Sequence, residues 1–274
     1  MTYHEEYVEL SSSPDPLRTR WLTYQNGERT SATILGLHML GLGAESFSGI
    51  AESLAAFGLD YKLHCYDQRG NASAAIQPPQ SFRQWVEDAL SALDRISDER
   101  VHLVGASLGG SVAASLAAEI QENRIASLTL IATPAAAQPA FTDRACAERE
   151  GTLDRIEKET IKRWFGDAGN STVVEMARQS IRRMTARGHD SAWRAFAQFD
   201  GYAKIARRLP ATLCIAFADD VSTPPGEMDL IAEQLHAAGR AVRRVDISGA
   251  GHVGMLCKPA EVAALVIDHI RTNP

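Results

Sequence analysis

Cysteine is scarce in this chain: the four cysteines among its 274 residues are widely spaced, at Cys65, Cys146, Cys214 and Cys257. None belongs to a Cys-x-x-Cys pair, and neither a His-Glu-x-x-His motif nor a cluster of cysteine and histidine occurs. The sequence therefore implies no metal site. Isolated cysteines of this kind are typical of reduced, mostly buried thiols in a cytoplasmic protein.

Long apolar runs are missing as well. No stretch approaches the roughly 20 apolar residues that a membrane-spanning helix needs, and residues 1–6 are acidic and lack the apolar segment of a signal peptide. We therefore expect a cytoplasmic protein with no membrane partner. The glycines from Gly41 to Gly43 have neither Rossmann nor P-loop spacing, so no nucleotide cofactor is implied.

Basic residues are outnumbered: the chain has 28 lysines and arginines against 34 aspartates and glutamates, which gives a net charge of -6. Because no basic cluster is present, this balance argues against a nucleic-acid partner. Apolar residues make up 45% and charged residues 23% of the chain, as in ordinary globular proteins. The length predicts one domain with at most one insertion and leaves open whether the chain forms a homo-oligomer.

The chain does contain short apolar segments that alternate with helical patterns. Strand-like segments at 61–66, 101–104 and 125–131 are separated by stretches with a helical spacing of apolar residues. This alternation predicts an α/β fold with a mostly parallel central sheet and helices on both faces. Near the N-terminus, Asn26-Gly27 predicts a hairpin before a strand at 30–37.

The strand pattern stops after Pro134 and resumes at residue 211. The segment between them is charged, has helical spacing and is interrupted by glycines, so it predicts a helical insertion rather than a separate fold. We expect an α/β core domain of residues 1–134 and 209–274, and an inserted helical lid of residues 135–208.

The strand at 101–104 leads into Gly105-Ala106-Ser107-Leu108-Gly109, and an alanine-rich helix follows. A strand that runs straight into a helix must turn sharply, and small residues allow such a turn. A Gly-x-Ser-x-Gly pattern in this context is a nucleophile elbow, which exposes the serine side chain at its apex. A chance glycine-serine loop is the alternative, but the strand before and the helix after favour Ser107 as a nucleophile.

Two later loops supply the partners that a serine nucleophile needs, a base and an acid that orients the base. In folds with this elbow, the acid and then the histidine follow the serine in chain order, on loops after later strands. Asp220 follows a strand at 211–218 and is the predicted acid, with Asp219 as the runner-up and helix capping as the alternative role. His252 follows a strand at 242–247 in a glycine-containing loop and is the predicted base.

An oxyanion intermediate also needs backbone donors. The N–H of Leu108, at the start of the elbow helix, is one candidate, and the helix dipole there favours negative charge. The second donor is expected from the early loop His38-Met39-Leu40-Gly41. We select the N–H of Leu40, with that of Met39 as the alternative, and interpret His38 as a scaffold residue of the loop.

These residues resemble the α/β-hydrolase superfamily in type and in order. The matching segments are Gly105 to Gly110, Asp67-Gln68-Arg69-Gly70, Asp220 before Pro224-Pro225, and Gly249-Ala250-Gly251-His252. Together they cover essentially the whole chain outside the expected lid. The resemblance implies the α/β-hydrolase fold, a Ser107-His252-Asp220 triad and no cofactor.

Within the superfamily, the chain most resembles the 3-oxoadipate enol-lactonase-like branch. His38-Met39-Leu40-Gly41 is similar to that branch's oxyanion loop, and Arg163-Trp164-Phe165 and Trp193 are similar to parts of its lid. The chain departs from the family pattern at Met39, where many members carry glycine. It departs again at Asn71-Ala72, where residues such as Gly-His-Gly are usual.

The resemblance implies a serine hydrolase that cleaves a small ester or lactone through an acyl-enzyme on Ser107. C–C bond hydrolysis, acyl transfer, amide hydrolysis and cofactor-free haloperoxidation use the same triad and stay open. A small-ligand receptor on a hydrolase fold is the alternative of another class.

Arg163 is interpreted as a solvated surface residue rather than a partner for a substrate carboxylate. We expect four residues to form the substrate-binding wall: Met39, Trp164, Phe165 and Trp193.

Overall fold

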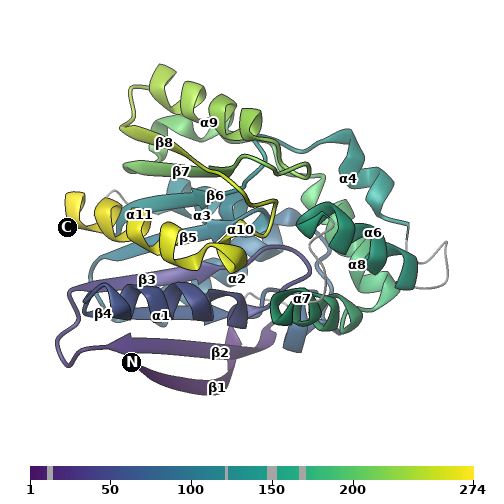
Figure 1. Cartoon of the computed structure of the whole chain (residues 1–274), viewed down its shortest axis with the longest axis horizontal. Coiled ribbons are helices and arrows are strands. Elements are labelled where there is room, and N and C mark those ends of the chain that lie inside the picture. Colours follow the sequence, from purple (N-terminus) through teal and green to yellow (C-terminus); the bar gives the residue numbers. More distant parts are fainter. Residues whose placement is uncertain (11–14, 121–122, 147–152, 167–170) are drawn as a thin grey trace.

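A single sheet of eight strands forms the centre of the described structure (Figure 1). The computed structural model describes residues 1–10, 15–120, 123–146, 153–166 and 171–274. The strands are β1 (Thr2–Leu10), β2 (Leu17–Asn26), β3 (Ala32–Leu37), β4 (Tyr61–Tyr66), β5 (Val101–Ala106), β6 (Ile125–Ile131), β7 (Thr212–Phe217) and β8 (Val242–Ile247). They lie in the order β1-β2-β4-β3-β5-β6-β7-β8 across the sheet.

The part of the sheet from β4 to β8 is parallel throughout. β2 runs opposite to the other seven strands, since it pairs antiparallel with both β1 and β4. Because parallel strands end at the same edge, the loops that follow β3, β5, β7 and β8 all begin on one side of the molecule. This edge is where functional side chains of such a sheet can meet.

The hairpin predicted at Asn26-Gly27 is wrong. Gly27 does turn the chain, with a φ of 78°, but β3 pairs in parallel with β4 and β5 instead of folding back on β2. All six residues of β3 are buried, and buried backbone N–H and C=O groups need hydrogen-bond partners on both edges of the strand. The turn-forming pair determines the local direction of the chain, whereas packing determines the partner of the next strand.

Helices cover both faces of this sheet (Figure 1). One face carries α1 (Ser48–Ala56), α10 (Gly254–Cys257) and α11 (Pro259–Thr272), and the other carries α2 (Phe82–Asp94), α3 (Leu108–Glu119) and α9 (Pro225–Ala237). Short 3-10 turns complete the connections: η1 (Ala44–Phe47), η2 (Ala72–Ala74), η3 (Tyr202–Lys204) and η4 (Ala206–Arg208). The predicted α/β architecture, a mostly parallel sheet between two helical layers, is confirmed. No helix in the described part of the chain has both the length and the apolar character needed to cross a membrane.

The helices between β6 and β7 gather beyond one end of the sheet (Figure 1). Ser171 and Thr185 begin two of them, because each side-chain oxygen accepts an N–H three residues further on. Glu157 ties two of them together by accepting hydrogen bonds from Arg178 (3.0 Å) and Arg182 (2.7 Å). We refer to this group as the cap helices: α4 (Pro139–Arg144), α6 (Asp154–Phe165), α7 (Thr172–Arg182) and α8 (Ala186–Phe196).

The four cysteines lie in different surroundings. Cys65 and Cys214 are buried, but Cys146 is half-buried and Cys257 is exposed, so the expected burial holds for two of them. Burial raises the pKa of the Cys65 thiol, and it raises the pKa of Cys214 to about 12. These two thiols therefore stay protonated at neutral pH and act as small apolar side chains of the core.

Candidate active site

Ser107 stands at the apex of a tight turn between β5 and α3. Its φ of 50° and ψ of -117° lie in a region that residues with a side chain seldom adopt. The turn requires glycine on either side of it. A Cβ added at Gly105 would lie 2.4 Å from the Gly109 carbonyl oxygen, and a Cβ at Gly109 would lie 2.0 Å from the Leu37 carbonyl oxygen. The strained backbone places Ser107 directly after the strand, at the carboxyl edge of the sheet.

The structure brings Ser107, His252 and Asp220 together from three loops. Nε2 of His252 lies 3.1 Å from Oγ of Ser107, and Nδ1 of His252 lies 2.8 Å from Oδ2 of Asp220. The three residues are buried, with 7%, 5% and 3% of their surface exposed for Ser107, His252 and Asp220. Asp219, the runner-up for the acid, is exposed. A continuous line from carboxylate through imidazole to hydroxyl is the arrangement that activates a serine.

Asp220 stays ionised in spite of its burial. Burial would raise the pKa of this carboxyl group, but the charge and hydrogen bond of His252, together with hydrogen bonds from Thr223, lower it below the ordinary value. Its Oδ1 accepts the backbone N–H groups of Ser222 (2.7 Å) and Thr223 (3.0 Å). The carboxylate is therefore charged at neutral pH and can hold the imidazole in one orientation.

Thr223 is a member of the site that the sequence did not predict. Its hydroxyl oxygen lies 2.8 Å from Oδ2 of Asp220, 2.8 Å from the carbonyl oxygen of Ala132 and 3.1 Å from Nδ1 of His252. The sequence feature that could have identified Thr223 is its position three residues after the predicted acid, because aspartate side chains often accept hydrogen bonds from backbone N–H groups two or three residues later in the chain.

Leu40 and Leu108 lie on either side of the serine. Leu40 lines the same cavity as Ser107, and Leu108 is the first residue of α3. Within the described residues, neither of their backbone N–H groups donates to a protein acceptor. The alternative donor residue, Met39, is fully buried in the apolar cluster beneath α1 and does not line the cavity. Because both N–H groups lack a protein acceptor, they remain candidates for the oxyanion hole.

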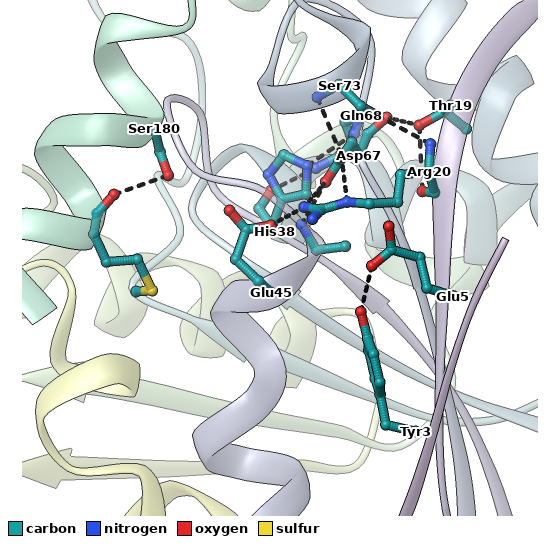
Figure 2. A network of polar contacts seen from close by, with 12 residues as sticks. Tyr3, Glu5, Thr19, Arg20, His38, Glu45, Asp67, Gln68, Ser73 and Ser180 are labelled. Atoms are coloured by element: carbon teal, nitrogen blue, oxygen red, sulfur yellow. Dashed lines mark hydrogen bonds and ion pairs between the residues drawn. The ribbon is translucent and has the colours of Figure 1, made fainter. Parts of the chain in front are cut away.

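His38 fixes the beginning of the loop that carries Leu40 (Figure 2). Its Nδ1–H donates to the Met39 carbonyl (2.8 Å), and its Nε2 accepts the backbone N–H of Gln68 (2.8 Å). Burial lowers the pKa of His38, so the ring stays neutral and keeps an acceptor nitrogen for Gln68. These contacts are those of the scaffold residue that the sequence suggests.

Asp67 fixes the end of the same loop (Figure 2). Its Oδ1 accepts the backbone N–H of Ala44 (2.7 Å), and its Oδ2 accepts the Nε–H of Arg20 (3.0 Å) and the N–H of Ser73 (3.1 Å). Burial would raise the pKa of Asp67, but the hydrogen bond and charge of Arg20 lower it. The charged carboxylate of Asp67 therefore holds the end of the loop at Ala44, and Asp67 itself does not line the cavity.

A narrow cavity lies between Ser107 and the cap helices. Of the residues predicted to contact the substrate, Trp164 and Trp193 line it, whereas Met39 and Phe165 do not. Phe165 comes two residues after Arg163 on α6, and residues two apart point about 200° apart around a helix, so Phe165 lies on the side opposite Arg163, which lines the cavity. The lining residues are Leu40, Ser107, Pro134, Phe141, Arg144, Arg163, Trp164, Trp193, Phe196, Ser222, Thr223 and His252.

Two arginines of this cavity, Arg144 and Arg163, form no ion pair with a carboxylate of the described residues. Arg163 donates from Nε to Oγ of Ser222 (3.1 Å) and from Nη2 to Oγ1 of Thr160 (3.2 Å). The guanidinium carbon of Arg144 lies 4.9 Å from the ring centre of Trp193. Burial and the charge of Arg163 lower the pKa of Arg144 to about 10, and burial lowers that of Arg163. Both stay charged at neutral pH, and the expectation that Arg163 is a solvated surface residue is wrong.

Residues 34–265 match the model of a family described as the alpha/beta hydrolase family. The chain belongs to the α/β-hydrolase family. The matched stretch contains Ser107, Asp220 and His252 and spans the sheet from β3 to β8 together with the cap helices. The α/β-hydrolase fold that the sequence resemblance implies is thereby confirmed.

This α/β hydrolase is similar to characterised lactonases and esterases. The 3-oxoadipate enol-lactonase 1 of Acinetobacter baylyi is 31% identical over 176 residues, which is 62% of this chain and 66%, just under two thirds, of that protein. Among solved structures, a thermophilic esterase from Thermogutta terrifontis is similar with a TM-score of 0.84 and 21% identity, over 97% of this chain and 98% of that one. The enol-lactonase from Burkholderia xenovorans LB400 has a TM-score of 0.80 and 22% identity, over 92% and 97% of the two chains. The structures support the fold, and the curated relative confirms the resemblance to the enol-lactonase-like branch.

Proposed function

We propose that this α/β hydrolase cleaves a small carboxylic ester or lactone through an acyl-enzyme on Ser107. The observation that carries the proposal is the position of His252, within hydrogen-bond distance of both Oγ of Ser107 and Oδ2 of Asp220. Family membership and the enol-lactonase relative support a carboxylic ester or lactone as the bond that is cleaved.

In the acylation half of the reaction, Nε2 of His252 takes the proton of Ser107 while Oγ attacks the carbonyl carbon. Asp220 accepts the Nδ1–H of His252, which fixes the tautomer and stabilises the imidazolium that forms. The tetrahedral oxyanion binds the N–H groups of Leu40 and Leu108, and each donor of this kind is worth roughly 10²–10³ in rate.

Collapse of the intermediate completes the exchange. His252 gives its proton to the leaving oxygen, the carbonyl–oxygen bond breaks, and the acyl group stays on Ser107. In a lactone the leaving oxygen remains attached to the acyl group, so ring opening yields an acyl-enzyme that keeps both parts of the substrate. A water molecule activated by His252 then attacks the acyl carbon and frees Ser107.

The cap helices form the lid of this enzyme in our proposal. The core, residues 1–134 and 209–274, supplies the nucleophile, base and acid. The lid, residues 135–208, supplies much of the wall opposite Ser107, through Arg144 on α4, Trp164 on α6 and Trp193 on α8. The core therefore performs the chemistry, and the lid selects the substrate.

An acidic substrate suits this lid best. Arg144 and Arg163 place two positive charges in the cavity beside Ser107, and neither forms an ion pair within the described residues. Guanidinium groups bind carboxylates through two parallel hydrogen bonds, and a partly buried cation without a counter-ion is costly. A carboxylate on the substrate would relieve this cost and orient the scissile carbonyl toward Ser107. The adipate in the name of the A. baylyi relative is itself a carboxylic acid.

Pre-steady-state release of p-nitrophenol from p-nitrophenyl acetate tests the proposal. Wild type should release it, in a burst or in steady turnover, and Ser107→Ala should abolish release while its melting temperature stays close to that of wild type. Asp220→Asn should lower kcat by roughly 10²–10⁴, because the base loses its orienting carboxylate. The matched control, Asp219→Asn at an exposed position, should stay close to wild type. Full release by Ser107→Ala would overturn the assignment of the nucleophile.

A further inference from the structure

The Leu40 N–H belongs to a tight turn formed by residues 39–42. The N–H of Leu42 donates to the Met39 carbonyl (3.2 Å), and Gly41 has a φ of 87° while Leu40 does not have a positive φ. This combination is that of a type II turn, in which glycine occupies the third position. The peptide between Leu40 and Gly41 can adopt two opposite orientations in tight turns, which distinguish type II from type I.

One side chain holds that peptide. Oδ1 of Asn71 accepts the N–H of Gly41 (2.8 Å), and its Nδ2 donates to the carbonyl groups of Gln68 (3.2 Å) and Arg69 (3.1 Å). Asn71 has no exposed surface. The carbonyl partners fix which end of the amide is nitrogen, and both N–H groups and the oxygen are used.

We propose that Asn71 is a positioning residue for the oxyanion hole: by holding the N–H of Gly41 it fixes the turn of residues 39–42, and so keeps the Leu40 N–H, in the adjoining Met39–Leu40 peptide, aimed at the reacting carbonyl. The inference rests on the proposed function, because it assigns the Leu40 N–H to the oxyanion. Without Asn71, the buried N–H of Gly41 would have no acceptor, and the turn would have to rearrange to supply one. The Met39–Leu40 peptide, which carries the donor, is joined to the Leu40–Gly41 peptide at the Cα of Leu40, so a rearranged turn shifts the donor.

The other contacts of this loop do not act on the turn itself. His38 is held at the start of the loop, and Ala44 at its end, by the polar network around Asp67 (Figure 2). Only Asn71, among the residues that the structure describes, bonds a side chain to the central peptide of the turn. The network fixes the two ends of the loop, and Asn71 fixes the orientation of the peptide between them.

The test compares the rate of Ser107 acylation with substrate binding in Asn71→Leu, a variant with the same branching at Cγ and without the amide. A misplaced oxyanion donor weakens the transition state and not the bound ester, and a displacement of about 1 Å can cost ~10²-fold in rate. We expect the burst rate constant for p-nitrophenyl acetate to fall by about 10- to 100-fold, with the apparent Kd of the ester within about threefold of wild type. The affinity for phenylboronic acid, which forms a tetrahedral adduct on a nucleophilic serine, should fall by a similar factor.

Gly41→Ala tests the same peptide from the other side. Alanine is strained at a φ of 87°, and its Cβ would lie 3.2 Å from Cη2 of Trp164, so the turn must change. If Asn71 and Gly41 act on one peptide, the double variant should lose little more rate than the worse of the two single variants. Losses that add fully would show that Asn71 acts elsewhere.

Asn26→Leu is the matched control, because Asn26 also donates from its side chain to a backbone carbonyl, that of Leu59 (2.9 Å), but does not line the cavity. It should lower the melting temperature without changing the burst rate constant. A folded Asn71→Leu with wild-type acylation and boronate affinity would overturn the inference while leaving the proposed function intact. Failure of the proposed function would instead appear as activity in Ser107→Ala. If Asn71→Leu does not fold, Asn71→Ser and Gly41→Ala decide by the same criteria.

Discussion

At the scale of single residues, Arg144 carries a charge that aromatic neighbours hold in place without neutralising. Its guanidinium lies over the rings of Trp193 (4.9 Å) and Phe141 (5.9 Å). Trp193 is in turn fixed by a hydrogen bond from its Nε1 to Nε2 of His189 (3.0 Å). Cation–π contacts of this kind orient a guanidinium and leave its N–H groups available to an anion. This arrangement suits the acidic substrate that we propose.

Arg144→Gln should therefore change which esters are hydrolysed. We expect wild type to prefer mono-p-nitrophenyl succinate, which carries a carboxylate, over the neutral p-nitrophenyl acetate. In Arg144→Gln, kcat/KM for the succinate ester should fall by about 10- to 100-fold, the value of a hydrogen bond to a charged group, while that for the acetate should stay within about threefold. Arg155→Gln, an exposed arginine on α6, should change neither. An equal loss for both esters in Arg144→Gln would contradict recognition of a carboxylate.

The sequence predicts some of these residues and not others for a physical reason. The meeting of the three triad side chains could be predicted because chain order and strand ends place their loops at one edge of a parallel sheet. Thr223 instead acts through Ala132, which is 91 residues away, and Asn71 acts through Gly41, which is 30 residues away. Hydrogen bonds between distant loops depend on the path of both loops, and no local pattern encodes them.

At the scale of elements, α6 and α7 are joined by a buried carboxylate. Glu157 on α6 is 1% exposed and accepts hydrogen bonds from Arg178 and Arg182, both on α7. Because α6 also carries Arg163 and Trp164 into the cavity, a looser joint should disturb substrate binding as well as local stability.

Glu157→Gln should loosen the cap without unfolding the sheet. We expect the free energy of local opening in α6 and α7 to fall by about 1–3 kcal/mol, given that the arginine partners are partly exposed, so amide hydrogen exchange there becomes faster. We also expect KM to rise. Exchange in β5 and β6 should be unchanged. The matched control is Glu159→Gln on the same helix, where Glu159 is 59% exposed and lies 3.6 Å from Arg155. Similar exchange in both variants would show that the buried joint has no special role.

Strands could be predicted more closely than the cap. The segments expected at 61–66, 125–131 and 242–247 coincide with β4, β6 and β8. Amphipathic spacing shows that a helix has a buried face without showing what covers that face. For this reason the sequence did not show which residues of α6 face the cavity: Arg163 lines it and Phe165 does not, the opposite of what was expected.

At the scale of the whole molecule, histidines in and around the sheet make the free energy of unfolding depend on pH in the mildly acidic range. His64 on β4 and His102 on β5 are largely buried, and burial lowers the pKa of each to about 4. Burial also lowers the pKa of His38 and of His269 on α11. Since the pKa of each is about 6.5 in an unfolded chain, the unfolded state binds more protons than the folded state at mildly acidic pH.

The free energy of unfolding should therefore decrease as the pH falls from about 6.5 toward 4. Stability from neutral histidines is fully present above the unfolded pKa and is lost as protons bind preferentially to the unfolded state. For His64 and His102, a pKa of about 4 against about 6.5 corresponds to on the order of 2 kcal/mol each at pH 5. Urea unfolding at pH 7 and pH 5 measures the difference in the free energy of unfolding between the two pH values.

His64→Gln and His102→Gln should each reduce this difference, whatever they do to stability at pH 7. The control His236→Gln, at an exposed position, should leave the difference unchanged. An unchanged difference in both core variants would mean that these histidines accept protons inside the folded protein at pH 5, against what their burial predicts.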